Sequence, residues 1–163
     1  MRNIILARVD DRLIHGEVVT SWIPFTKANA VIVVDDEIAN DVFNKRVLKA
    51  LSPSGVSMEI YSVDEAVDVL NGEEIKGELV IVLAKTPTTF ERLIVENKVD
   101  IKSVNIGGMG IRGERKPFFK NCSASPDEVA SIKNMKDKGI DVYYQLIAEN
   151  GKMSLDEAIN GYK

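Results

Sequence analysis

Short apolar runs alternate with amphipathic segments along the whole chain, and this alternation predicts the secondary structure. Six runs are rich in β-branched residues and apolar at nearly every position, as is typical of strands that have helices over both faces of a parallel sheet. The predicted strands are residues 3–9, 30–35, 57–61, 78–84, 103–106 and 141–145. Strands that alternate with helices in this way predict an α/β fold.

Polar start signals separate the strands from the helices. Serines that precede a glutamate by three positions predict capping boxes at Ser62, Ser125 and Ser154. Thr86 precedes a proline and opens a further helix. Apolar residues at helical spacing over residues 38–51 predict another, which Pro53 and Gly55 end. Because there is no internal repeat or linker-like stretch, we expect residues 1–163 to form a single doubly wound domain with a mainly parallel central sheet flanked by helices.

The composition limits the kind of protein. Of the 163 residues, 45% are hydrophobic and 28% are charged, which is typical of a globular protein. The 21 basic and 25 acidic residues give a net charge of −4, so neither nucleic acid nor an anionic membrane surface is expected as the main partner. The lone cysteine, Cys122, excludes an intramolecular disulfide and a cysteine-rich metal cluster. No apolar run approaches the roughly 18 residues of a membrane helix, so we expect a cytoplasmic protein.

The loop after the first strand carries the best candidate chemistry. Ligands of doubly wound folds gather at the carboxyl ends of the strands. The only histidine of the chain, His15, follows the first strand at such a place. An amphipathic helix begins just after His15, and Pro24 discourages its continuation. The free backbone N–H groups of a helix N-terminus favour an anion beside His15.

Charged side chains around His15 fit a phosphoryl carrier. Arg8 and Arg12 lie in the same short stretch, and guanidinium groups pair well with phosphate oxygens. Cations and a helix N-terminus disfavour the imidazolium, so we expect a neutral, nucleophilic ring near neutral pH. Asp10 or Asp11 accepts a hydrogen bond from the other ring nitrogen and sets the tautomer, or caps the helix instead. Against this stands the simpler interpretation of a surface histidine beside a solvated ion-pair cluster.

A resemblance to a known family begins at the same loop. The motif reads Arg8-x-Asp10-Asp11-Arg12-Leu13-Ile14-His15-Gly16. It resembles the active-site segment of the enzyme IIB component of the mannose/fructose/sorbose family of the bacterial sugar phosphotransferase system. Residues 104–109 and 139–145 are also similar to the family, so the resemblance runs over nearly the whole chain.

The resemblance implies a relay between two other proteins. His15 would accept a phosphoryl group from a phosphohistidine of the IIA component and pass it to a sugar held by the membrane components IIC and IID. Family members carry the group on the ring nitrogen nearer the backbone, and such a relay needs no cofactor and no metal. The protein would then associate with the inner face of the membrane through IIC and IID.

The resemblance also implies roles for the neighbours of His15. Arg8 and Arg12 match positions expected to contact the phosphate or an acidic partner surface, and Asp10 is expected to take part in catalysis. Glu17 departs from the family, whose members often have glutamine there, and it places a negative charge close to the phosphate. Apart from the resemblance, further residues are expected to bind the phosphate or the partner: Asp11 and Gly16 in the same loop, and Lys85 and Thr86 at the end of the fourth strand, if that strand neighbours the first. For Thr86, a simple helix cap is the competing interpretation.

Two other functions remain open. Residues 108–113 match the G-x-G-x-x-G pattern of a dinucleotide-binding loop, but that pattern needs a helix immediately after it, and residues 114–117 are a poor helix opening. The loop would otherwise form part of the rim around His15 and add positive charge for an acidic partner. The second alternative is a non-catalytic module whose basic loop docks such a partner.

Overall fold

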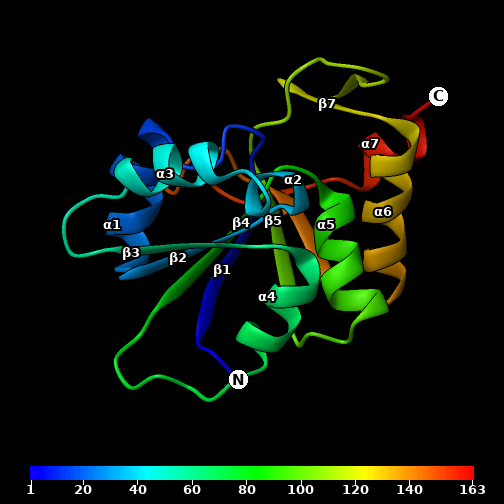
Figure 1. The fold of residues 1–163 in the computed structure, drawn as a ribbon. Coiled ribbons are helices and arrows are strands. Elements are labelled where there is room, and N and C mark those ends of the chain that lie inside the picture. The colour runs from blue at the N-terminus through cyan, green and yellow to red at the C-terminus, as the bar shows by residue number, and fades with distance from the viewer.

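A mainly parallel sheet of seven strands forms the centre of the molecule (Figure 1). The computed structural model describes residues 1–163. The strands of the sheet are β1 (Ile4–Val9), β2 (Ala30–Val34), β3 (Ser57–Tyr61), β4 (Val80–Ala84), β5 (Ser103–Ile106), β8 (Asp141–Tyr144) and β9 (Met153–Ser154). They lie in the order β3-β2-β4-β1-β5-β8-β9, and only β9 runs antiparallel to its neighbour. A separate antiparallel hairpin pairs β6 (Lys116–Phe119) with β7 (Cys122–Ala124).

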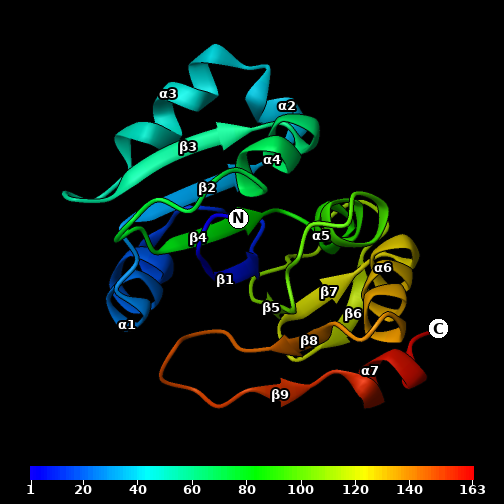
Figure 2. The ribbon, with the colours of Figure 1, turned by 90° about the horizontal axis from the view of Figure 1, so that it is seen from below.

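Helices cover both faces of this sheet (Figure 2). The helical segments are the π-helical turn η1 (Val18–Trp22), α1 (Ile23–Thr26), α2 (Asp36–Ala39), α3 (Val42–Ala50), α4 (Val63–Leu70), α5 (Pro87–Glu91), the π-helical turn η2 (Arg92–Glu96), α6 (Pro126–Asp137) and α7 (Asp156–Gly161). The larger apolar core contains buried side chains of α4, α5, η2 and α6, and the smaller one contains those of η1, α1 and α2. None of these helices has the length and apolar character that a membrane span requires.

The central strands send alternate side chains to the two cores. In β2, Ala30, Ile32 and Val34 join the larger core, whereas Val31 and Val33 join the smaller one. The side chains of β4 divide between the cores in the same way. Because helices cover both faces, nearly every position of such a strand is apolar, which explains the uninterrupted apolar runs in the sequence.

The parallel sheet agrees with the sequence pattern. All six predicted strands form, and the doubly wound α/β fold is confirmed. The capping boxes at Ser62 and Ser125 form as predicted. The prediction at Ser154 is wrong, because Ser154 lies in β9, where it pairs with Tyr143. Its hydroxyl accepts the backbone N–H of Asp156, and α7 begins without a capping box.

The apolar pattern over residues 38–51 forms two helices rather than the single helix that we predicted. Asp41 interrupts it by accepting the backbone N–H of Asn44, and so starts α3 as a separate helix. Several apolar residues at helical spacing do not reach a core. Those left exposed are Val42, Phe43, Val47 and Leu51. The spacing therefore predicted helical structure correctly but not the burial of its apolar face.

The helix after His15 begins at Gly16, as predicted, but Pro24 does not end it. A proline lacks the N–H of a regular helical bond, and its ring crowds the carbonyl four residues back. The preceding turn η1 is π-helical, and Ile23 donates its N–H to the carbonyl of Val18. Since this wider turn accommodates the proline, the helix continues through α1.

Three short strands were not predicted. β6 contains Pro117, and β7 and β9 have only three and two residues, too few for an alternating pattern to be visible. The β6–β7 hairpin stands beyond the sheet at the top of Figure 1. A hairpin rather than a helix thus follows residues 108–113, which argues against the dinucleotide-binding interpretation.

Candidate functional site at the carboxyl end of β1

The chain turns sharply where β1 ends, between β4 and β5. The backbone N–H of Asp10 donates to the carbonyl of Ala84 at 2.9 Å, which ties the loop to the end of β4. Leu13 has a left-handed φ of 56° and a buried side chain. This conformation is uncommon outside glycine. The backbone N–H of Leu13 donates to the carbonyl of Asp10 at 2.9 Å and closes a turn, after which His15 lies against Asp10.

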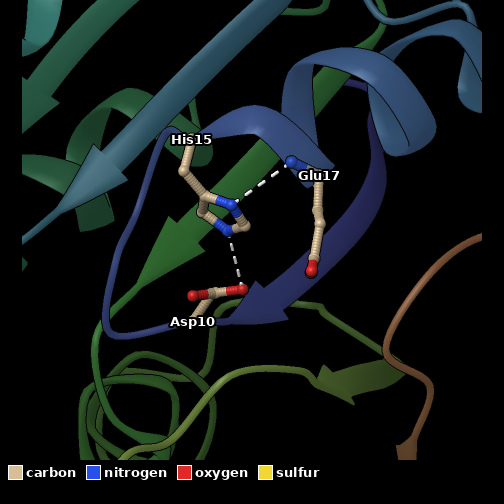
Figure 3. A group of neighbouring side chains, drawn as sticks. All are labelled: Asp10, His15 and Glu17. Carbon is tan, nitrogen blue, oxygen red and sulfur yellow. Dashed lines mark hydrogen bonds and ion pairs between the residues drawn. The ribbon is translucent and has the colours of Figure 1, made fainter.

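The His15 ring is held through both of its nitrogens (Figure 3). Nε2 lies 2.9 Å from Oδ2 of Asp10, and Nδ1 lies 3.3 Å from the backbone nitrogen of Glu17. A carboxylate only accepts and a backbone N–H only donates, so Nε2 carries the proton and Nδ1 keeps its lone pair. The side chain is 15% exposed. The nitrogen that keeps its lone pair is therefore the one nearer the backbone, at the N-terminus of a helix.

Asp10 is the centre of the hydrogen-bond network. Its fully buried carboxylate accepts from Nε2 of His15, from Nη2 of Arg8 at 3.1 Å and from Nε of Arg12 at 3.3 Å. Burial raises the pKa of Asp10, but the hydrogen bond from His15 and the charge of Arg8 outweigh it, so the pKa lies well below its usual range. Asp10 is thus ionised at neutral pH, and its geometry suits the expected role of setting the tautomer of His15.

Arg8 is buried, which corrects the expectation that it contacts the phosphate or a partner surface. Its side chain is 0% exposed, and its guanidinium lies 5.0 Å from the ring centroid of Trp22. The acceptors of its guanidinium are the side chains of Asp10 and Asn105 and the carbonyls of Gln145 and Leu146. Arg8 is buried because successive side chains of β1 alternate between the two faces of the sheet, and Arg8 points to the face that η1 covers. Arg8 is therefore a positioning residue that holds Asp10.

Two glycines after β5 make room for this network. A Cβ on Gly107 would overlap the guanidinium of Arg8. A Cβ on Gly108 would come within 2.9 Å of Oδ1 of Asp10. Gly107 and Gly108, at the start of the glycine-rich segment, therefore allow the backbone to pack closely against two side chains at the end of β1.

Gly107→Ala is expected to lower the free energy of unfolding by about 1–3 kcal/mol, because the added methyl group forces Arg8 out of its place. Chemical denaturation of the variant and the wild type measures this loss. Gly151→Ala is the matched control, since a Cβ at that position meets nothing within 4 Å. An unchanged unfolding midpoint in Gly107→Ala would show that the guanidinium can shift without cost.

Asp11 holds the neighbouring loop in place and also lines the cavity beside Arg12, and its expected role as a phosphate- or partner-binding residue stays a prediction. Its carboxylate is 6% exposed and accepts from the N–H of Gly110 at 2.8 Å and from Nη1 of Arg115 at 2.8 Å. Arg115 also pairs with Glu128 in the first turn of α6, at 2.8 Å. Asp11 thus holds residues 108–113 beside the loop after β1.

Lys85 and Thr86 follow β4, which is the neighbour of β1 in the sheet. The hydroxyl of Thr86 accepts the N–H of Thr88 at 3.0 Å, so Thr86 is the cap of α5. The Nζ atom of Lys85 lies 3.8 Å from a carboxylate oxygen of Asp35. Both side chains are thus engaged elsewhere, and neither takes part in the hydrogen bonds around Asp10.

Arg12 is the cation of the site that faces solvent. Its side chain is 48% exposed, and it bridges Asp10 and Glu17, whose Oε2 lies 3.1 Å from Nη2 of Arg12. A cavity of about 300 Å³ adjoins them and is lined in part by Arg12, Glu17 and Tyr144. Gly16 begins the helix next to His15, and a Cβ there would meet no atom within 4 Å. An anion beside His15 would meet both Arg12 and the first turn of the helix.

Asp10, His15 and Glu17 are also spaced as metal ligands could be, because one ligand atom of each lies within 4.8 Å of the others. The oxygens of Asp10 already accept from Arg8, Arg12 and His15. Two guanidinium groups at this carboxylate also repel a further cation. The arrangement is therefore better suited to an anion at His15 than to a metal ion.

Sequence reasoning missed three residues of the network, Asn105, Gln145 and Leu146. Asn105 accepts from Arg8 and donates to the carbonyl of Gln145 at 3.1 Å. A signal for Asn105 was present, because an amide within an apolar strand needs a buried partner. Gln145 and Leu146 bind Arg8 through their backbone carbonyls. Any residue type can supply a carbonyl, so the sequence gives no sign of these two contacts.

Comparison with known protein families identifies the family of this chain. The family model of the PTS system sorbose subfamily IIB component matches residues 4–163. The chain belongs to this family. The resemblance seen in the loop after β1 is thereby confirmed, and the chain is a IIB component of the phosphotransferase system of sugar transport.

Relatives and solved structures support this membership. The mannose-specific EIIAB component of Escherichia coli K12 is 36% identical over 155 residues, which cover 95% of this chain and 48% of the relative. The chain thus spans about half the length of that relative. The fructose-specific EIIB component of Bacillus subtilis 168 is 35% identical over 140 residues, or 86% of this chain and 85% of the relative. The crystal structure of the IIBSor domain of the Klebsiella pneumoniae sorbose permease superposes with a TM-score of 0.90 at 29% identity, covering 99% of this chain and 98% of that one.

Proposed function

We propose that this IIB component relays a phosphoryl group, with His15 as its covalent carrier. The donor is a phosphohistidine of a IIA protein or domain, and the acceptor is a sugar held by the membrane components IIC and IID. Residues 1–163 act as one domain in the cytoplasm and reach the membrane through IIC and IID. One observation carries the proposal: Nδ1 of His15 presents a lone pair at a helix N-terminus while the buried Asp10 holds Nε2.

The transfer to His15 is an in-line displacement. The N–H of Glu17 releases the lone pair of Nδ1. This lone pair forms the new N–P bond while the bond from phosphorus to the donor imidazole breaks, and the electron pair of that bond returns to the donor ring. The Nε2 proton stays on His15, and Asp10 stabilises the positive charge that the ring gains. In the second transfer a sugar hydroxyl oxygen attacks phosphorus, its proton passes to a base or to water, and Nδ1 leaves with the electron pair.

The charge on the transferring group is balanced by donors at the surface of the site. Arg12 lies beside His15 with its guanidinium partly exposed, and the backbone N–H of Glu17 points at Nδ1. Both groups can donate to phosphoryl oxygens. Arg8 acts through Asp10, which it keeps ionised and in place.

A phosphorylated IIA protein with a radiolabelled phosphoryl group tests the proposal. The label should move to the wild-type protein, should be acid-labile and base-stable as an N–P bond is, and should map to the peptide that contains His15. An acid-stable label, or a label on another peptide, would refute a phosphohistidine at this position. No further function is proposed, because the hairpin after residues 108–113 removes the support for nucleotide binding.

Arg12→Ala is expected to slow transfer from phosphorylated IIA by roughly 10²-fold, as the loss of one charged donor at a reacting group does. The fold should be kept, because the Arg12 side chain is 48% exposed and the buried carboxylate of Asp10 keeps Arg8 and His15 as donors. Rapid-quench labelling measures the rate, and Arg46→Ala on the exposed side of α3 is the control. A wild-type rate in Arg12→Ala would remove Arg12 from the site.

A further inference from the structure

Glu17 brings a second carboxylate to the site, beside the atoms that the proposed transfer uses. Its backbone N–H contacts Nδ1 of His15, and its Oε2 lies 3.1 Å from Nη2 of Arg12. One of its oxygens lies within 4.8 Å of a ring nitrogen of His15 (Figure 3). A single residue thus contacts the nucleophile through its backbone and the exposed cation through its side chain.

The two carboxylates that share Arg12 are held very differently. Asp10 is fully buried and also accepts from Arg8 and His15. The side chain of Glu17 is 35% exposed, and Arg12 is the only group that its carboxylate binds. Glu17 is therefore the carboxylate that can release Arg12 when another anion arrives.

We propose that Glu17 competes with the phosphoryl group for Arg12 and thereby keeps the phosphohistidine short-lived and ready for transfer. This inference rests on the proposed function. A protein-bound phosphoryl group carries a charge of about −1.5 to −2 near neutral pH. On Nδ1 it would stand beside the Glu17 carboxylate, and both anions would need the same guanidinium. Glu17 thus stabilises the unphosphorylated protein, in which it has Arg12, and destabilises the phosphorylated one.

The repulsion is relieved as the N–P bond breaks. The electron pair of that bond returns to Nδ1, and phosphorus bonds to the oxygen of the acceptor, a sugar hydroxyl or water, whose proton passes to a base or to solvent. Glu17 forms no bond in this step and acts only through its charge and through Arg12. For unit charges about 5 Å apart, removing one of them changes the equilibrium by about fourfold in bulk water and by roughly a hundredfold or more at the effective dielectric of a protein surface. Because salt screens two partly exposed charges, we take a change of about tenfold, between these limits, as the expected effect. Glu17 is therefore a residue that tunes the transfer rather than a catalytic residue.

Glu17→Gln tests this inference, because it removes the charge and keeps the shape. Both proteins are phosphorylated with phosphoramidate, a small donor that needs no IIA partner, and the decay of phosphohistidine is followed by phosphorus NMR. The phosphohistidine of Glu17→Gln should last about tenfold longer, and the difference from wild type should shrink as the salt concentration rises. Glu73→Gln, at an exposed glutamate after α4, is the matched control and should decay like wild type.

The outcomes separate this inference from the function on which it rests. Equal lifetimes, or a shorter one in Glu17→Gln, would overturn the role of Glu17. A longer lifetime that does not respond to salt would also overturn it, because the cause would then be a changed geometry rather than charge. If neither phosphoramidate nor phosphorylated IIA placed a phosphoryl group on His15 of the wild type, the proposed function itself would fail.

Discussion

Replacing His15 with glutamine is expected to reduce phosphoryl transfer from IIA by roughly 10³-fold or more, because the nucleophile is lost. The amide nitrogen of glutamine can take the place of Nε2 and donate to Asp10, which lies 2.9 Å from Nε2 in the wild type. The buried carboxylate then keeps a donor, whereas the lone pair that forms the N–P bond is gone. The substitution thus separates the chemistry of His15 from its part in the structure.

The measurement for His15→Gln is the rate at which label passes from phosphorylated IIA to the variant. Circular dichroism and the denaturation midpoint show whether the fold is kept. A folded variant that is labelled at the wild-type rate would mean that another residue carries the phosphoryl group. The roles given to Asp10, Arg12 and Glu17 would then lose their basis.

Replacing Arg8 with methionine is expected to lower the free energy of unfolding by about 3–5 kcal/mol, since it leaves one partner of a buried ion pair without the other. Methionine fills much of the same volume and can still pack against Trp22, so the loss is mainly electrostatic. The fully buried Asp10 carboxylate loses its buried cation. The carbonyls of Gln145 and Leu146, which accept from Arg8 at 2.9 Å, lose their donor.

Denaturant unfolding of Arg8→Met measures this loss, and a second variant identifies its cause. Asp10→Asn combined with Arg8→Met removes both charges, so the double variant should be more stable than the sum of the single losses implies. Strict additivity would show that the charge of Asp10 is not what makes Arg8 necessary. A loss below about 1 kcal/mol in Arg8→Met alone would show that Arg12 or solvent can replace the buried cation.

The sheet could be predicted from the sequence because burial on both faces imposes one simple pattern. β2 and β4 are covered by two cores, and every one of their side chains is buried. The edge elements carry no such pattern. Ser154 looks like a helix cap from its neighbours alone, and only its pairing with Tyr143 places it in a strand. That pairing depends on the return of a distant segment, which local spacing cannot reveal.

The reactive part of the candidate site could be predicted because it is local in sequence. His15 and Asp10 lie in one loop, and the helix that follows could be read from its spacing. The different roles of the two arginines could not be predicted from the sequence. Arg8 and Arg12 share the same chemistry, and the difference between them is set by strand alternation and by Asn105 on the neighbouring strand. Such a contact appears only when the sheet order is known.

The close fit between Gly107 and Arg8 restricts the order in which mutations can accumulate. Any larger residue at position 107 overlaps the guanidinium as long as the arginine is present. Loss of the arginine first would leave the Asp10 carboxylate buried without its cation. Neutralising Asp10 first would in turn leave Arg8 buried without its anion. Each single change is therefore costly, and such epistasis is expected to couple positions 8, 10 and 107, so that a larger residue at 107 should occur together with a smaller one at position 8.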